Sequence, residues 1–160
     1  MKLRVKKIVL AILLILWMIT VFWFSNQGAD DSSDTSGNTI RAIINLIPSI
    51  RQMESAEKEK IVSDLQPYAR KLAHYTMYTI GGIIAFLNVK EYFTDDEKRI
   101  AISIIIGSTY SITDEFHQMF VDGRAGEFKD IVIDTLGVCL GIAIMLIIVK
   151  IKERRLKNGW

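Results

Sequence analysis

The stretch Thr113–Gly137 reads TDEFHQMFVDGRAGEFKDIVIDTLG and joins two runs of apolar residues. It contains four Asp, two Glu, one Lys and one Arg, together with His117 and Gln118. Apolar runs of this length are typical of membrane helices, in which charged side chains are rare and costly. The stretch therefore predicts membrane helices whose charged groups meet one another in a common site.

The 160-residue chain has the length of one ordinary domain, and we interpret residues 1–160 as a single membrane domain. Half of the residues are hydrophobic and lie in blocks, which indicates a small integral membrane protein. No nucleotide-binding glycine loop is present, and we expect the lipid bilayer, not nucleic acid, as the partner. Cys139 is the single cysteine, so an internal disulfide is excluded.

Four apolar segments approach the roughly 20 residues that a membrane helix requires. They cover residues 8–25, 72–90, 100–120 and 131–149. Lys and Arg are abundant before the first segment and after the fourth, in the sequence KIKERRLK. Because cytoplasmic ends of membrane helices are enriched in these residues, we expect both termini in the cytoplasm. The sequence thus predicts an all-α, multi-pass protein of the cell membrane with a four-helix transmembrane bundle.

The basic start followed by an apolar run also fits a cleavable signal peptide. The run 8–25 is long for such a peptide, however, and the following SNQGADD offers no convincing small-residue cleavage site. We therefore expect an uncleaved helix, with Trp23 and Phe24 near the outer interface.

Residues 26–69 form the expected outer segment between the first two spans. Its beginning, NQGADDSSDTSGNT, has the composition of a flexible acidic stretch. The remainder carries apolar residues at helical spacing, interrupted by Pro48 and Pro67. This pattern predicts one or two short amphipathic helices on the outer surface. We interpret the segment as a connector or lid, with a dedicated binding domain as the alternative.

Counting along the expected helices brings ionisable residues of separate spans to one depth. A helix rises about 1.5 Å per residue, and basic residues mark the inner ends of the spans. Three residues then lie about 24 Å from the inner ends of their own helices: His74, Glu115 and Asp134. Four more lie at about 30 Å or just below: Gln27, Arg70, Gln118 and Asp130. The simplest arrangement turns these side chains inward, around a polar pocket that opens to the outside.

Two glycine patterns support this arrangement. Gly123, in the turn VDGRAGE, suits the left-handed conformation that ends a helix, and it presents Arg124 at the rim of the pocket. The Arg124 guanidinium fits a carboxylate or phosphate ligand, or it pairs with a neighbouring surface carboxylate. Gly137 and Gly141 form a small-xxx-small pair, which predicts close packing of the fourth span against a neighbour.

Four pieces of the sequence resemble the VanZ family of bacterial membrane proteins. They are FSNQ, RKLAHYTMY, DEFHQMFVDGR and DIVIDTLG, in the order in which the family has them. The resemblance implies a multi-spanning membrane protein with functional residues at the matching positions: Ser25, Gln27, Lys71, His74, Tyr78, Asp114, Glu115, Gln118, Arg124 and Asp130. The chain departs from the family at Asp134, where the family more usually has Asn. This change would favour a bound cation or a protonated carboxyl group.

The founding member of the VanZ family is associated with low-level resistance to the glycopeptide teicoplanin. The resemblance therefore implies a role at the cell envelope, with an effect on glycopeptide susceptibility as one expectation. It supplies no biochemical activity, and the sequence carries no drug-specific mark.

Three functions are compatible with the expected pocket. An enzyme would act on a lipid-linked phosphate, with these acid–base candidates: Glu115, His74, Asp114 and Asp130. A binding protein would recognise a lipid-linked cell-wall precursor or a lipoglycopeptide through these residues: Ser25, Gln27, Arg70, Lys71, Tyr78, Gln118, Arg124 and Asp134. A structural protein would use its polar groups as interhelical hydrogen bonds, each worth roughly 0.6 kcal/mol. No nucleophile stands out, and the oligomeric state stays open.

We expect no metal site and no cofactor, because neither H-x-x-x-H nor H-E-x-x-H spacing occurs. The alternative is a divalent cation bound by His74, Glu115 and Asp134, with His117 and Asp130 as further candidate ligands. On its own helix, His117 fits a rim or packing position better than a ligand position.

Overall fold

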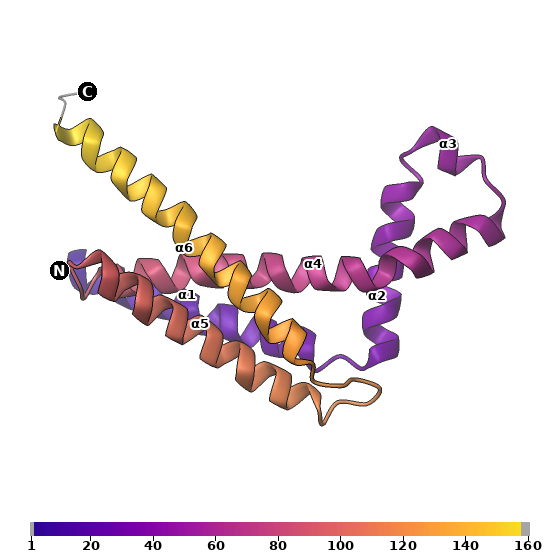
Figure 1. Cartoon of the computed structure of the whole chain (residues 1–160), viewed down its shortest axis with the longest axis horizontal. Coiled ribbons are helices and arrows are strands. Elements are labelled where there is room, and N and C mark those ends of the chain that lie inside the picture. Colours follow the sequence, from indigo (N-terminus) through magenta and orange to yellow (C-terminus); the bar gives the residue numbers. More distant parts are fainter. Residues whose placement is uncertain (1, 158–160) are drawn as a thin grey trace.

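A computed structural model describes residues 2–157, and within them it contains six helices and no strand. In chain order the helices are α1 (Lys2–Ser25), α2 (Ala29–Ile44), α3 (Pro48–Arg51), α4 (Ser55–Lys90), α5 (Asp96–Gln118) and α6 (Phe128–Lys157). Helices α1, α4 and α5 run along the long axis of the molecule, and α6 crosses them (Figure 1). The expected all-α class is confirmed.

Three of the described helices are long and apolar enough to cross a membrane: Leu3–Ser25, Ser55–Lys90 and Phe128–Leu156. They contain the expected spans 8–25, 72–90 and 131–149. The expected span 100–120 lies on α5, which is helical over 23 residues but is not among the three. The C-terminal half of α5 buries Ser111, Asp114, Glu115 and Gln118, and these polar residues lower its hydropathy.

The start of α1 and the turn between α4 and α5 lie at one end of the molecule. Lys6 forms an ion pair with Glu91, and the Lys7 ammonium lies 4.1 Å from the centroid of the Tyr92 ring. The described part of α6 also ends on this side (Figure 1, left). The basic ends of the chain therefore lie on one side, and the α5–α6 loop lies on the other.

The acidic stretch after α1 is helical, so the expectation of a flexible segment was wrong. Residues Ala29–Ile44 form α2, which stands at a steep angle to α4 (Figure 1). Ile40 and Ile44 pack against Val62 of α4 in a small buried cluster. Arg41 donates to both carboxylate oxygens of Glu59, at 2.9 and 2.8 Å. These contacts with α4 explain why a sequence of low hydrophobicity is helical here.

Pro67 does not end a helix, contrary to the expectation that it separates an amphipathic helix from the second span. Helix α4 runs without interruption from Ser55 to Lys90 and contains Pro67. A proline inside a helix removes one backbone hydrogen bond and permits a bend. Helix α4 changes direction where it passes α2 (Figure 1). One helix therefore contains both the segment that packs against α2 and the expected second span.

The closest packing in the molecule lies between α4 and α6. A Cβ atom added to Gly141 would lie 2.1 Å from the Thr79 carbonyl oxygen, and one added to Gly137 would lie 2.5 Å from the Tyr75 carbonyl oxygen. The expected close approach of the Gly137–Gly141 pair to a neighbour is confirmed, and the neighbour is α4. Large buried side chains surround this crossing: Trp17, Tyr78, Phe86, Val138 and Ile142.

Replacement of Gly141 by valine should destabilise the protein, because the new side chain would overlap the Thr79 carbonyl oxygen. Overpacking of this kind costs about 1–3 kcal/mol, and we expect a lower thermal unfolding temperature in detergent. Gly37→Ala is the control, since its Cβ would meet only side-chain atoms and no backbone: Arg41 and Gln66, both at 3.4 Å, and Val62 at 3.7 Å. Equal unfolding temperatures for Gly141→Val and the parent protein would contradict the close helix contact.

Candidate functional site

A cavity of about 650 Å³ lies between the helices, with walls from α1, α2, α4, α6, the end of α5 and the α5–α6 loop. This volume lies in the range of small-molecule binding sites. Most of the residues that the sequence analysis selected line the cavity: Ser25, Gln27, Arg70, Lys71, His74, Tyr78, Gln118, Arg124, Asp130 and Asp134. The other two, Asp114 and Glu115, are buried and contact the lining residues Ser25 and Gln118.

Asp114 ties three helices together at the cavity. Its Oδ2 atom accepts a hydrogen bond of 2.8 Å from Ser25 Oγ, at the end of α1. The same oxygen accepts from Tyr78 on α4 at 3.4 Å and from the Gln118 amide at 3.3 Å. Ser25, Tyr78 and Asp114 are each no more than 3% exposed. A buried carboxylate requires such donors, and here they fix α1, α4 and α5 relative to one another.

Glu115 connects α5 to the loop that precedes α6. Its Oε2 atom accepts a 3.0 Å hydrogen bond from the Glu127 backbone N–H, and its Oε1 atom accepts from Gln118 Nε2 at 3.4 Å. The side-chain oxygen of Gln118, Oε1, in turn accepts a hydrogen bond of 3.2 Å from Arg124 Nη1. Gly123, with φ of 71°, turns the chain just before Arg124, as its place in the sequence predicts.

Asp134 of α6 is fully buried and lies between α4 and α5. Its Oδ2 atom accepts a 3.0 Å hydrogen bond from Ser111 Oγ on α5. Its Oδ1 atom lies 3.7 Å from His74 Nδ1 on α4, which is close enough for an ion pair but long for a hydrogen bond. Asp134 Oδ1 and Asp114 Oδ1 are both buried without a hydrogen-bond partner.

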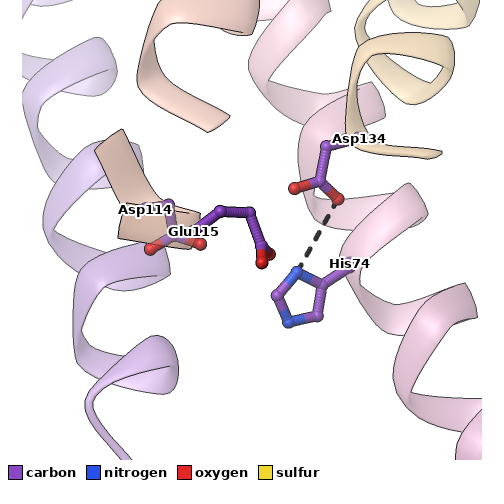
Figure 2. A group of neighbouring side chains, drawn as sticks. All are labelled: His74, Asp114, Glu115 and Asp134. Atoms are coloured by element: carbon purple, nitrogen blue, oxygen red, sulfur yellow. Dashed lines mark ion pairs between the residues drawn. The ribbon is translucent and has the colours of Figure 1, made fainter. Parts of the chain in front are cut away.

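His74, Asp114, Glu115 and Asp134 converge from three helices (Figure 2). One nitrogen or oxygen atom of each residue lies within 4.8 Å of the corresponding atoms of the others. At an effective dielectric constant of about 20, two like charges 4.8 Å apart repel by about 3–4 kcal/mol. Three carboxylates at this spacing therefore require a counter-charge or protonation.

The cavity wall also carries three cationic side chains, which differ in their partners. Lys71 forms ion pairs with Asp130 and Glu127. Arg70 and Arg124 have no carboxylate partner in the described part of the chain, so the expected alternative, in which Arg124 pairs with a neighbouring surface carboxylate, is not observed. Arg124 Nε is buried without a partner. Burial, and after it the neighbouring Arg70 cation, lowers the pKa of Arg124, so an anion bound here would be favoured.

Comparison with known proteins adds one result to this geometry. A model of the VanZ/LLP1 family matches residues 10–149, which include every cavity residue named above. The chain belongs to the VanZ/LLP1 family. The resemblance that the sequence motifs indicate is therefore confirmed, and family membership together with the apolar helices identifies a membrane protein. Searches of the curated proteins and of the solved structures find no match.

His117 lies apart from the carboxylate cluster of this VanZ/LLP1 protein. Its ring stacks on Phe22 at a centroid distance of 4.5 Å, and its Nε2 atom lies 3.3 Å from the Asn26 side-chain oxygen. These contacts are those of a packing histidine, as expected for its position on the helix. Asp130 also lies outside the cluster, because it pairs with Lys71.

The sequence analysis of this VanZ/LLP1 protein missed several site residues. Ser111 is fully buried and holds Asp134; its spacing of three and four residues from Asp114 and Glu115 places it on the same helical face and is the available signal. Glu127 contributes its backbone N–H to Glu115. Helix α2 supplies hydroxyl groups to the cavity wall: Ser32, Thr35, Ser36 and Thr39. These α2 residues were missed because their segment reads as flexible.

Replacement of Ser25 by alanine should destabilise the fold, because Asp114 Oδ2 loses its shortest hydrogen bond. Removal of one donor from a buried acceptor costs about 1–3 kcal/mol, measured as a lower thermal unfolding temperature in detergent. Ser63→Ala is the matched control, since the exposed Ser63 hydroxyl bonds only to Lys60 of its own helix, and its change should stay within about 0.5 kcal/mol. Equal effects of the two substitutions would show that the Ser25–Asp114 bond does not stabilise the bundle.

Proposed function

We propose that this protein crosses a bacterial cell membrane four times and binds the phosphate headgroup of a lipid-linked cell-envelope molecule in an outward-facing cavity. The observation that carries the proposal is the pair of guanidinium groups on the cavity wall. Arg70 and Arg124 line the cavity without a carboxylate partner in residues 2–157. Unpaired cations beside a cavity are costly until an anion joins them.

The polarity of α5 supports its assignment as a membrane span in addition to α1, α4 and α6. Its buried positions are small or polar: Ser103, Gly107, Ser111, Asp114, Glu115 and Gln118. Its exposed positions include Ile105, Ile112 and Phe116, each more than half exposed. A water-soluble helix has the opposite pattern, with apolar residues inside. Apolar residues outside and polar residues inside fit a helix that faces lipid on one side and a polar site on the other.

The distribution of basic residues supports the orientation. Lys6 and Lys7 contact the α4–α5 turn, and α6 ends on that side of the molecule (Figure 1). An excess of Lys and Arg marks the cytoplasmic side, so both termini lie in the cytoplasm. The cavity includes residues of the α5–α6 loop, at the opposite end, and therefore opens to the outside.

The chemistry of the wall favours a lipid phosphate over a free ion. A guanidinium presents several donors in a planar fork that matches phosphate oxygens. The same wall contains apolar side chains next to the polar ones: Val21, Phe24, Met77 and Ile133. An anionic headgroup with the first carbons of its lipid chain would contact both kinds of surface. Masking such a headgroup would alter susceptibility to glycopeptide antibiotics that bind cell-wall precursors at the membrane.

Catalysis on the same headgroup is the second candidate. His74 and Asp134 line the cavity and lie 3.7 Å apart, with Glu115 next to them (Figure 2). An imidazole beside carboxylates is suited to proton transfer. The substitution Glu115→Gln distinguishes the two candidates. In an enzyme it would abolish turnover, whereas binding of the headgroup would be retained both in an enzyme and in a binding protein.

The four-span topology is testable by labelling of single cysteines in a Cys139→Ala background. With four crossings, Ser63→Cys and Ala125→Cys should react with a membrane-impermeant maleimide in intact cells. Thr94→Cys, in the α4–α5 turn, should react only after permeabilisation. If Thr94→Cys and Ala125→Cys show the same pattern, α5 does not cross the membrane and the proposed topology is wrong.

Headgroup binding is testable with farnesyl phosphate as the probe for detergent-purified protein, measured by calorimetry. We expect binding of farnesyl phosphate and at least tenfold weaker binding of farnesol, which lacks the anion. Arg124→Ala and Arg70→Ala should each weaken binding of farnesyl phosphate at least tenfold, because each removes a cation from the cavity wall.

Arg41→Ala is the matched control for these variants. The Arg41 guanidinium is paired with Glu59 and does not line the cavity, so its removal should leave the affinity unchanged. Equal binding of farnesol and farnesyl phosphate, or equal effects of the three arginine substitutions, would contradict the headgroup proposal. Complementation of a deletion strain with the same variants then reports glycopeptide susceptibility.

A further inference from the structure

The carboxylate cluster at the cavity has an unusual pattern of hydrogen bonds. Asp114 and Asp134 each have one oxygen, Oδ2, that accepts hydrogen bonds from neighbouring hydroxyl groups. The other oxygen of each, Oδ1, is buried without a hydrogen-bond partner, and Asp134 Oδ1 has only His74 Nδ1 at 3.7 Å. The two residues are only 3% and 0% exposed, so bulk water has little access to these oxygens. Buried oxygens without a donor are rare in native proteins and require an explanation.

We propose that His74, Asp114, Glu115 and Asp134 bind one divalent transition-metal ion, with Zn²⁺ as the best fit. Each residue offers one ligand atom, and the four atoms lie within 4.8 Å of one another (Figure 2). Protein ligands about 2 Å from one ion lie roughly 3.5 Å apart, so small side-chain rotations bring the four atoms to a common centre. The ion accounts for the two oxygens that have no hydrogen-bond partner.

The surroundings of the cluster are those of ligands held in place. Ser25, Tyr78 and Gln118 donate to Asp114, and Ser111 donates to Asp134. The Glu127 backbone N–H donates to Glu115. Hydrogen bonds to the non-ligating atoms orient the ligands of protein metal sites in this way. All donors to Asp114 and Asp134 bond to Oδ2, so the Oδ1 atom of each residue is available to a metal ion.

The mixture of ligand types selects the class of ion. Mg²⁺ and Ca²⁺ prefer oxygen ligands alone, whereas an imidazole together with carboxylates suits Zn²⁺ and related ions. A divalent charge also offsets the repulsion among the three carboxylates. The nearby Lys71 and Arg124 form no ion pair with the three carboxylates, because Lys71 pairs with Asp130 and Glu127, and Arg124 bonds to the Gln118 amide.

This inference goes beyond headgroup binding and stands without it. The ion would border the cavity, since His74 and Asp134 line its wall. It would add positive charge to the surface that also carries Arg70 and Arg124. The test below uses the metal alone, so its result does not depend on the identity of any lipid.

The full chain, purified in detergent and stripped with EDTA, should bind one Zn²⁺ per chain in calorimetry and in metal analysis after dialysis. His74→Ala and Asp134→Asn should each weaken the affinity at least tenfold, because each removes a ligand. Saturating Zn²⁺ should raise the thermal unfolding temperature of the parent protein, and this shift should be lost in both variants. Mg²⁺ should bind much more weakly than Zn²⁺.

His117→Ala and Asp122→Asn are the matched controls, with the same residue types outside the cluster. Both should keep the parent affinity and the Zn²⁺-dependent shift in unfolding temperature. Gel filtration and unfolding of every variant without metal separate loss of a ligand from loss of folding. Absence of Zn²⁺ binding, binding that His117→Ala removes and His74→Ala preserves, or equal affinity for Mg²⁺ would each overturn the assignment.

Discussion

Burial of carboxylates between helices is the constraint on which the rest of the structure depends. Asp114, Glu115 and Asp134 are all nearly inaccessible to water, and a charge in such a place is unstable unless donors or counter-charges surround it. The donors come from α1, α4, α5 and the α5–α6 loop. The helices must therefore meet at this point and in this register, and the cavity lies beside that meeting point.

Close helix packing makes this arrangement possible. Asp134 reaches His74 only because α6 lies against α4 with almost no side chain between their backbones. Gly137 and Gly141 supply that proximity, and both follow Asp134 on α6, within two helical turns of it. The glycines of one helix thus determine the distance between two titratable groups on different helices. The segment from Asp134 to Gly141 therefore determines both the close packing of α6 on α4 and the position of the Asp134 carboxylate beside His74.

Sequence reasoning predicted which polar residues lie together better than it predicted the helices around them. Depth counting works for His74, Glu115 and Asp134 because a helix has a fixed rise, so equal distances from the basic ends bring them to one level. The prediction for α2 was wrong because Asp, Ser and Gly are weak helix formers. The contacts that stabilise α2, with Val62 and Glu59, come from a different helix of the chain. The prediction that Pro67 interrupts the helix was also wrong, because α4 accommodates this proline by bending. No local motif reports a cluster whose members lie on three helices.

The polarity of the site explains why α5 has the weakest membrane signal of the expected spans. The buried polar residues in the C-terminal half of α5 contribute to the cluster or the cavity, and they lower the hydropathy by which a membrane helix is recognised. The charges are also arranged by sign, with carboxylates at the buried base and unpaired guanidinium groups on the cavity wall. A base that attracts a cation and a wall that attracts an anion are complementary to a metal ion and a phosphate bound next to each other. The polar residues that make α5 a poor hydrophobic segment, Ser111, Asp114, Glu115 and Gln118, are therefore also the residues through which α5 contributes to the buried cluster and the cavity.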